Sequence, residues 1–295
     1  MPVGGRRVPV VLGYRDPQAY RTDPYFLGIL VGRVANRISG AGFDVDGRRY
    51  MLAANDPPNH LHGGPGGIYG QNWAVDPDGA RSVRLRLVSP DGHQGYPGRV
   101  TLTVTITLRR HTVTYDMRAE TDRPTPVNLT QHSYYNLMGQ GAIYDHSVQI
   151  AADQFTPTDA AMIPTGDIRA LAGQGFDLRR AKTLQQADPG HHGLDLNYVL
   201  SGTPDRPAAN VSAPNGLQLT LRTDQPCLQL YSAAHLGRAG TPLGGQDHAP
   251  FARLCLEPQG FPNAINTPGF PSTLISPDRP YRQITQICSA PKVAA

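Results

Sequence analysis

Glu257 and His132 are the two side chains whose surroundings most favour acid–base chemistry. Glu257 is one of only two glutamates in the chain and directly follows the apolar run Leu254–Leu256. A carboxylate in such a strand costs free energy unless it is paired or functional, and burial raises its pKa toward that of a working base. A histidine such as His132 titrates near neutral pH. A glutamate base and a histidine acid together suit proton transfer between two oxygens.

A second pair, His60 and His62, lies two residues apart in the sequence Asn59–Gly64. On a strand this spacing puts both imidazoles on one face, which suits a metal site of the cupin kind. That pattern also needs a glutamate a few residues later, whereas Gly64–Gly67 follows here. The sequence therefore argues against a metal.

Each candidate also has an interpretation without chemistry. Arg37 would serve equally well as a surface or salt-bridged arginine, and His132 taken alone is more often a hydrogen-bonded core or turn residue. Asp195 in GLDLNYVL and Gln229 in CLQLYS are two further polar residues that could belong to the same site. Residue types alone leave these alternatives open.

The elements that must position these side chains are predicted to be strands. The 295 residues include 32 Gly and 28 Pro, about one residue in five, and both residues break helices. From Val100 to Leu108, apolar residues alternate strictly with threonine, which is the period of a strand with one buried face. A hairpin should follow, with its second strand at Thr112–Arg118. Further strands are expected at 83–88, 217–222, 227–231, 253–257 and 283–288, and a short helix is expected to begin at Thr22-Asp23-Pro24.

Composition and missing motifs exclude several classes of protein. The net charge is only +4 and no basic stripe is present, so nucleic acid is not an expected partner. No apolar run approaches a membrane span, and no Walker, dinucleotide-binding or G-x-S-x-G pattern occurs. The cysteines Cys227, Cys255 and Cys288 are odd in number and widely spaced, which favours buried thiols and a cytoplasmic location.

Seven segments, taken in order, resemble the aldose 1-epimerase (galactose mutarotase) family. They extend over nearly the whole chain, so we expect a single all-β domain over residues 1–295. The resemblance implies a large antiparallel β-sandwich with few short helices and an open sugar-binding cleft. The segments are GRVANRI (32–38), NHLHGG (59–64), GYPG (95–98), NLTQHSYYNL (128–137), GLDLNYVL (193–200), LQLYS (228–232) and LCLEPQGFPNAIN (254–266).

The resemblance also implies catalytic roles. Glu257 corresponds to the base that takes the proton from the anomeric hydroxyl, and His132 to the acid that protonates the ring oxygen. His62 corresponds to a second histidine near that oxygen. The pyranose is expected between Glu257 and His132. Activity should then fall in acid as Glu257 gains a proton and in alkali as His132 loses one.

The same resemblance implies how the sugar is held. Asn36, Arg37 and Asp195 correspond to residues that bind the sugar hydroxyls, and Gln229 to a further polar contact beside the base. Because both proton carriers are side chains, neither a metal nor an organic cofactor is expected. The expected partner is a small monosaccharide, with no nucleic acid and no membrane.

The chain departs from the family pattern at three places. Gln131 stands where Asn usually precedes the acid histidine, and Pro258 stands where Thr usually follows the base. Asn263 replaces the usual Asp. The chain also reaches its first matching segment, Val10–Tyr14, almost at once, so it looks short at the N-terminus. A sheet edge would then be left open, and Val8–Leu12 is apolar enough to be that strand. The edge should pair in a dimer or be covered by another segment.

The leading hypothesis is a mutarotase acting on a free hexose such as glucose or galactose. The alternatives are a relative acting on another sugar and a non-catalytic carbohydrate-binding module. A binding module would need no matched acid and base, which counts against it. A monomer and a homodimer are both compatible with the sequence.

Overall fold

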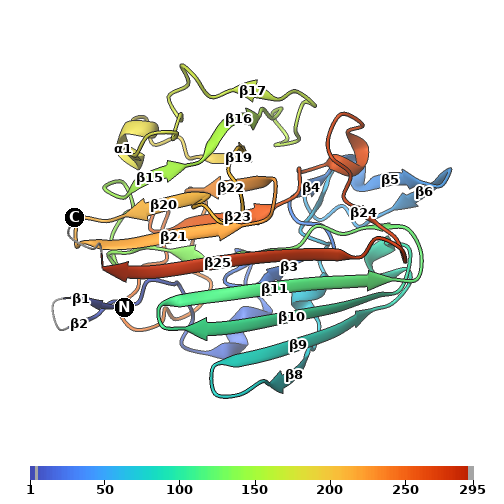
Figure 1. The fold of residues 1–295 in the computed structure, drawn as a ribbon, viewed down its shortest axis with the longest axis horizontal. Helices are drawn as coiled ribbons and strands as arrows, with labels where there is room; N and C mark the ends of the chain where they lie inside the picture. The colour runs from blue at the N-terminus through green and yellow to red at the C-terminus, as the bar shows by residue number, and fades with distance from the viewer. Residues whose placement is uncertain (4–5, 292–295) are drawn as a thin grey trace.

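The computed structural model describes residues 1–3 and 6–291 and consists mainly of two antiparallel sheets (Figure 1). The larger sheet has nine strands in the order β18 (Lys182–Thr183), β15 (Ser147–Ile150), β20 (Ala209–Ser212), β21 (Leu217–Thr223), β25 (Tyr281–Pro291), β11 (Thr112–Thr121), β10 (Val100–Arg109), β9 (Ser82–Ser89) and β8 (Ala74–Pro77). The smaller sheet has six strands in the order β14 (Tyr134–Tyr135), β23 (Leu254–Gln259), β22 (Cys227–Tyr231), β19 (Asp195–Leu200), β16 (Ala152–Thr156) and β17 (Arg169–Ala170). The predicted all-β class is therefore confirmed.

Short pairs of strands and single helical turns complete the fold. The strand pairs are β1 (Pro2–Val3) with β2 (Arg6–Arg7), β3 (Leu30–Val31) with β13 (Thr130–Gln131), β4 (Arg37–Ile38) with β7 (His60–Leu61), β5 (Gly42–Val45) with β6 (Arg48–Met51), and β12 (Thr125–Pro126) with β24 (Leu274–Ile275). The helical turns are α1 (Leu184–Ala187) and the 3₁₀ turns η1 (Pro17–Arg21), η2 (Ser39–Ala41), η3 (Ile68–Gly70), η4 (His93–Gly95) and η5 (Ala264–Asn266). Across the described residues, the helices are all too short to span a membrane.

The predicted strands are confirmed to within a few residues. β10 and β11 pair from Val100↔Thr121 to Arg109↔Thr112, so the expected hairpin turns at Arg110 and His111. Alternation places Val100, Leu102 and Val104 in the core and the intervening threonines outside it, as the period-2 pattern requires.

The two sheets pack face to face through one large apolar core. Val211, Leu219 and Leu221 of the nine-stranded sheet join Leu230 and Leu256 of the six-stranded sheet in this cluster. The leucines of β22 and β23 alternate with polar residues, so these strands bury one face in the core and turn the other away from it. That second face is where the candidate site forms.

The short helix expected to begin at Thr22-Asp23-Pro24 does not form. The 3₁₀ turn η1 has ended at Arg21, and the Asp23 carboxylate instead accepts hydrogen bonds from the amides of Tyr25 (3.3 Å) and Leu27 (2.6 Å). Aspartate side chains often compete in this way with helical hydrogen bonding, which is why the capping pattern here makes a turn.

Residues 10–12 lie along the outer edge of the six-stranded sheet, beside β14. Val11 forms a bridge with Tyr135, and the Leu12 amide donates to the Tyr134 carbonyl at 2.9 Å. The Asn136 amide donates in turn to the Val10 carbonyl at 2.9 Å. The N-terminal segment thus provides β14 with backbone partners on its outer side.

Arg33 is fully buried in a cage of carbonyl groups. Its guanidinium donates to the carbonyls of Ser89 (3.0 Å), Pro90, Pro97 and Gly98 (each 2.8 Å), and to the Ser89 hydroxyl (2.8 Å). Burial lowers its pKa to about 10, so the group remains charged at neutral pH. Arg33 thereby ties the GRVANRI segment to the loop that carries the GYPG motif.

We expect Arg33→Met to lower the free energy of unfolding by at least about 3 kcal/mol, because it leaves several buried carbonyls without donors. Guanidinium denaturation measures this loss. Arg49→Met is the control, since Arg49 makes an exposed ion pair with Asp44 at 2.8 Å and exposed pairs contribute about 0–1 kcal/mol. Equal losses in the two variants would contradict the carbonyl cage.

Candidate active site

All seven side chains predicted for the site line one cavity of about 270 Å³. They come from six separate segments of the chain, which the fold brings together on the polar face of the six-stranded sheet and the loops beside it. The residues are Asn36, Arg37, His62, His132, Asp195, Gln229 and Glu257. The structure therefore joins these seven residues. His60 is not among the residues that line the cavity, because its ring lies between the Ala53 carbonyl (2.7 Å) and the Tyr96 hydroxyl (2.9 Å).

Strand register positions the floor of this cavity. Gln229 on β22 lies directly opposite Glu257 on β23 and opposite Asn197 on β19. Residues directly opposite on neighbouring strands have side chains on the same face of the sheet. The alternation that sends Leu228 and Leu256 into the core thus sends Gln229 and Glu257 into the cavity.

Glu257 and His132 form a close buried pair. His132 Nε2 lies 3.6 Å from Glu257 Oε1, and the two residues are only 4% and 3% exposed. Burial lowers the pKa of His132 to about 4, and burial together with the Asp195 charge raises the pKa of Glu257 well above its ordinary value. The near-neutral pKa expected for His132 is therefore wrong, because a desolvated imidazole resists protonation.

His62 has a fixed tautomer. The backbone amide of Asn36 donates to His62 Nδ1 at 3.2 Å, so the neutral ring carries its proton on Nε2. Burial and the neighbouring His132 lower the pKa of His62 well below its usual range, which keeps the ring neutral. His62 can thus donate a hydrogen bond from Nε2 but is poorly suited to accept a proton there.

The same tautomer bears on metal binding. The donor atoms of His62, His132 and Glu257 lie within 4.8 Å of one another, a spacing that invites comparison with a metal site. A metal bound at His62 Nε2 would require the proton to move to Nδ1, where it would oppose the Asn36 amide. Three buried side chains could act as metal ligands, but the Nε2 atom of His62 carries a proton and has no free lone pair for a metal. The set therefore fits a metal poorly.

Arg37 and Asp195 supply polar groups at the side of the cavity. Arg37 Nε donates to Asp56 at 2.6 Å, so the salt-bridge alternative is confirmed while the residue still lines the cavity. The Asp195 carboxylate accepts from Gln229 Nε2 at 2.5 Å, and burial raises its pKa. Hydrogen-bonded groups of this kind suit the hydroxyls of a polar ligand.

Aromatic residues that the sequence reasoning missed also line the cavity. Phe26 packs edge-on against His62 with ring centroids 4.8 Å apart, and lies 6.2 Å from the His132 ring. Its backbone has φ 58°, a conformation rare for an aromatic residue, which no sequence pattern indicated. The remaining missed residues are Pro24, Tyr25, Leu61, Tyr134, Tyr231 and His235.

Alternation gave a signal for two of these missed residues. Tyr231 follows Gln229 at the strand period and therefore shares its face. Tyr134 stands in the same motif as His132 and lies opposite Cys255, two residues before Glu257 on β23. Both could have been predicted from the strand period once Gln229 and Glu257 were placed.

Gly63 shows why the segment after His62 needs glycine. Its φ is +86°, and a Cβ there would overlap the carbonyl of Gly32. Only glycine lets this loop approach the GRVANRI segment so closely. That approach brings His62 beside Asn36 and builds the wall of the cavity.

The cavity of this β-sandwich sets a buried carboxylate against a buried imidazole among polar side chains, which are the groups that acid–base chemistry on a small polar molecule needs. The family model described as Aldose 1-epimerase matches residues 3–288. The chain belongs to the aldose 1-epimerase family, whose members are isomerases.

Known relatives agree with this assignment. The galactose mutarotase of Bos taurus is 41% identical over 288 residues, covering 95% of this chain and 84% of the relative. The aldose 1-epimerase of Escherichia coli K12 is 37% identical over 292 residues, covering 94% and 83%. Among solved structures, an aldose epimerase homologue from C. elegans has a TM-score of 0.94 at 28% identity, covering 99% of this chain and 91% of that one.

We expect acid to destabilise the fold through its buried histidines. Burial lowers the pKa of His132 and His146 from 6.5 to about 4, and that of His60, His62, His93 and His248 in the same direction. The folded state therefore binds fewer protons than the unfolded state, so stability is full above about pH 6.5 and is lost as pH falls toward 4.

Urea denaturation at a series of pH values measures this effect. The free energy of unfolding should fall by several kcal/mol, on the order of 2–3 for each fully titrated histidine, between pH 7 and 4.5. The raised pKa values of Glu257 and Asp195 act in the opposite sense but involve fewer groups than the six histidines. His146→Gln should reduce the pH dependence and the exposed His111→Gln should not; a flat profile in the wild-type protein would contradict the argument.

Proposed function

We propose that this chain interconverts the α and β anomers of a free hexose such as galactose or glucose. The observation that carries the proposal is the 3.6 Å separation between His132 Nε2 and Glu257 Oε1 at the floor of the cavity. The anomeric hydroxyl oxygen and the ring oxygen of a pyranose are bonded to the same carbon. One closely spaced acid–base pair can therefore reach both oxygens at once.

This spacing changes where the sugar is expected to lie. A gap of 3.6 Å has no room for a pyranose between Glu257 and His132, so that part of the expectation is wrong. The sugar instead lies over the pair, within the cavity of about 270 Å³. A cavity of this size favours one monosaccharide over a longer chain.

The proposed reaction moves two protons and leaves the enzyme unchanged. The reaction starts from the form of the pair in which the single proton lies on His132. Glu257 takes the proton of the anomeric hydroxyl while His132 gives its proton to the ring oxygen, and the bond from C1 to the ring oxygen breaks. The resulting aldehyde rotates about C1–C2 and presents its other face. The steps then run in reverse: Glu257 gives its proton to the former aldehyde oxygen, and His132 takes one from the hydroxyl that re-forms the ring, so both residues regain their starting states.

The remaining groups are proposed to hold and orient the sugar. His62, with its proton on Nε2, donates toward the ring oxygen and supports the charge that develops there. Arg37, Asn36 and Asp195 bind hydroxyls away from C1, and Gln229 fixes Asp195 through its 2.5 Å hydrogen bond. None of these steps requires a metal or an organic cofactor.

Polarimetry of freshly dissolved α-anomers tests both the activity and the two catalytic residues. We expect accelerated mutarotation of α-glucose or α-galactose, with a pentose and a ketose completing the panel. Glu257→Gln and His132→Asn should each slow the reaction by about 10²–10⁴-fold, since each removes a general acid or base. Sugar binding, followed by thermal shift, should survive better than the rate.

The matched controls for these variants are Glu120→Gln, at the only other glutamate, and His111→Asn. Both residues are exposed and neither lines the cavity, so both variants should keep the wild-type rate. A wild-type protein that accelerates no sugar on the panel would overturn the proposal. Full activity in Glu257→Gln would overturn the assignment of the base.

The pKa directions also predict the pH–rate profile. The reactive form of the pair holds one proton. In water a glutamate loses its proton at a lower pH than a histidine does, whereas burial of His132 and Glu257 reverses this order. The rate should fall below about pH 4–5, where His132 is protonated while Glu257 also carries a proton. It should fall again in alkali, where Glu257 loses its proton and the pair holds none. Both assignments place the acid side of the profile in about the same range, so the alkaline side decides between them: a fall near the ordinary pKa of histidine, about 6.5, would restore the assignment expected from sequence.

A further inference from the structure

The strand that carries the base has an open edge beside the site. β23 pairs with β22 along its length, from Tyr231↔Cys255 to Cys227↔Gln259. On its other side, β14 pairs with it only at Leu254 and Cys255. From Leu256 onward, the outer edge of β23 lacks a paired strand among the described residues, although all of this stretch is buried.

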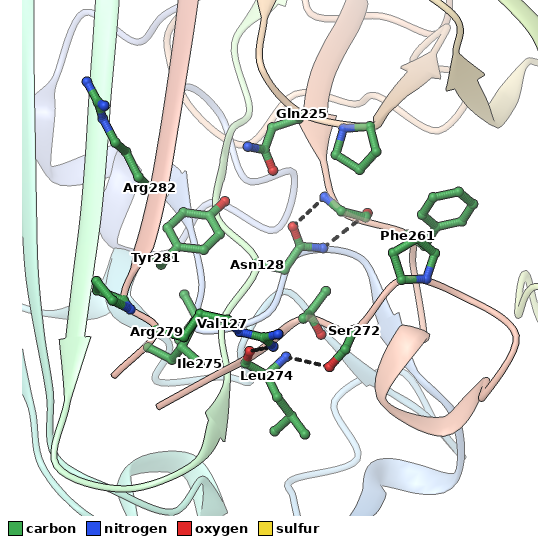
Figure 2. Close-up of a pocket in the computed structure, with 15 residues that line it drawn as sticks. Val127, Asn128, Gln225, Phe261, Ser272, Leu274, Ile275, Arg279, Tyr281 and Arg282 are labelled. Carbon is green, nitrogen blue, oxygen red and sulfur yellow. Dashed lines mark hydrogen bonds between the residues drawn. The ribbon is translucent and has the colours of Figure 1, made fainter. Parts of the chain in front are cut away.

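Side-chain amides occupy this edge in place of a strand. Gln131 Nε2 donates to the Leu256 carbonyl at 2.8 Å, and Gln283 Nε2 donates to the Pro258 carbonyl at 3.1 Å. Two residues further on, Asn128 pairs with both backbone groups of Gly260, accepting from its amide at 2.7 Å and donating to its carbonyl at 3.3 Å (Figure 2). These three residues, Gln131, Gln283 and Asn128, are called the amide ladder below.

Pro258 fits this arrangement. In a strand, the N–H and C=O of one residue point to the same side, so an N–H at position 258 would face the open edge. Proline has none, and proline in sheets is confined to such edges. The substitution beside the base, where the family usually has Thr, therefore removes no hydrogen bond that the sheet needs.

Gln131 has a second connection, which runs to the segment around His132, whereas Gln283 Oε1 accepts from the Tyr281 hydroxyl at 2.7 Å. Its Oε1 accepts from the Ser133 amide at 3.0 Å and from the Tyr135 hydroxyl at 3.4 Å. The side chain therefore spans from the residues around the acid to the base strand. Gln131 immediately precedes His132, and Leu256 immediately precedes Glu257.

We propose that Gln131 is a positioning residue that sets the separation of His132 and Glu257 by bonding the acid segment to the base strand at Leu256. The inference rests on the proposed function. Gln131 does not touch the sugar; it acts through the two residues next to it. At 2% exposure, its amide has no alternative partner in water, so the link is held firmly.

The consequence is catalytic because the pair has to meet two oxygens on one carbon. A misplacement of about 1 Å in such a site can reduce the rate by about 10²-fold. A shared proton is also sensitive to the distance between its carriers. Removing the Gln131 link should therefore lower kcat while leaving the hydroxyl-binding wall, and with it KM, largely intact.

The test compares Gln131→Met with Asn136→Leu. Gln131→Met keeps the length of the side chain and removes both hydrogen-bonding ends. Asn136 is an equally buried amide on the same part of the fold; it donates to the Ala252 carbonyl at 2.9 Å, five residues before Glu257. Both variants lose a buried amide, so both should lose stability.

Only Gln131→Met should lower kcat, by about 10–100-fold, with KM changed less than about 3-fold. A crystal structure of each variant gives a second readout, in which the His132–Glu257 distance should exceed 3.6 Å in Gln131→Met alone. Equal kcat losses in the two variants, or an unchanged distance in Gln131→Met, would overturn the proposal.

Gln131→Asn guards against failure of Gln131→Met to fold. It keeps both amide ends on an arm one methylene shorter, so it should retain one connection and lose part of kcat; a wild-type kcat would count against positioning. Should the wild-type chain accelerate no sugar, the proposed function fails, and the distance in the variant structures still decides whether Gln131 holds the pair together.

Discussion

The site depends on the removal of water from two titratable groups held 3.6 Å apart. In water, a glutamate loses its proton long before an imidazole does. Burial penalises the charged form of each group, which raises the pKa of Glu257 and lowers that of His132. The proposed reaction needs one proton given and one taken at neighbouring oxygens, and two groups whose pKa values approach each other suit that exchange. The surrounding packing serves to keep this pair dry and its separation fixed.

The six-stranded sheet meets both needs with one sequence pattern. Leu228 and Leu256 anchor β22 and β23 in the core, and the intervening Gln229 and Glu257 face the cavity. A slip of one residue would send the carboxylate into the core and a leucine into the site. The hydrophobic free energy that selects the register therefore also selects which face lines the cavity. Stability and function are joined here at the level of the strand period.

The strand period also made part of the fold and part of the candidate site predictable from sequence. The β10–β11 hairpin and the polar face of β22 and β23 follow from alternation, and the isolated Glu257 marked a site because so few glutamates occur. The turn at Asp23, the carbonyl cage of Arg33 and the conformation of Phe26 could not be predicted in the same way. Each depends on where distant backbone groups lie once the sheets have packed. The error in the pKa of His132 has the same origin, since its shift is produced by burial.

The motifs that resemble the family contain two kinds of side chain. Some line the cavity, where we propose that they bind or react, and others hold neighbouring segments of the chain in place. Arg33 and Arg37 share one motif, yet Arg33 is enclosed by carbonyls and Arg37 faces the cavity. Glu257 is held by backbone pairing on the β22 side and by the amide ladder on the other. Backbone hydrogen bonds between strands survive nearly any side-chain substitution, whereas a side-chain hydrogen bond is lost when that one residue is replaced. The distance between His132 and Glu257 is therefore the feature of this site that a single substitution can most easily change. Gln131, at a position where the family usually has Asn, is one such substitution.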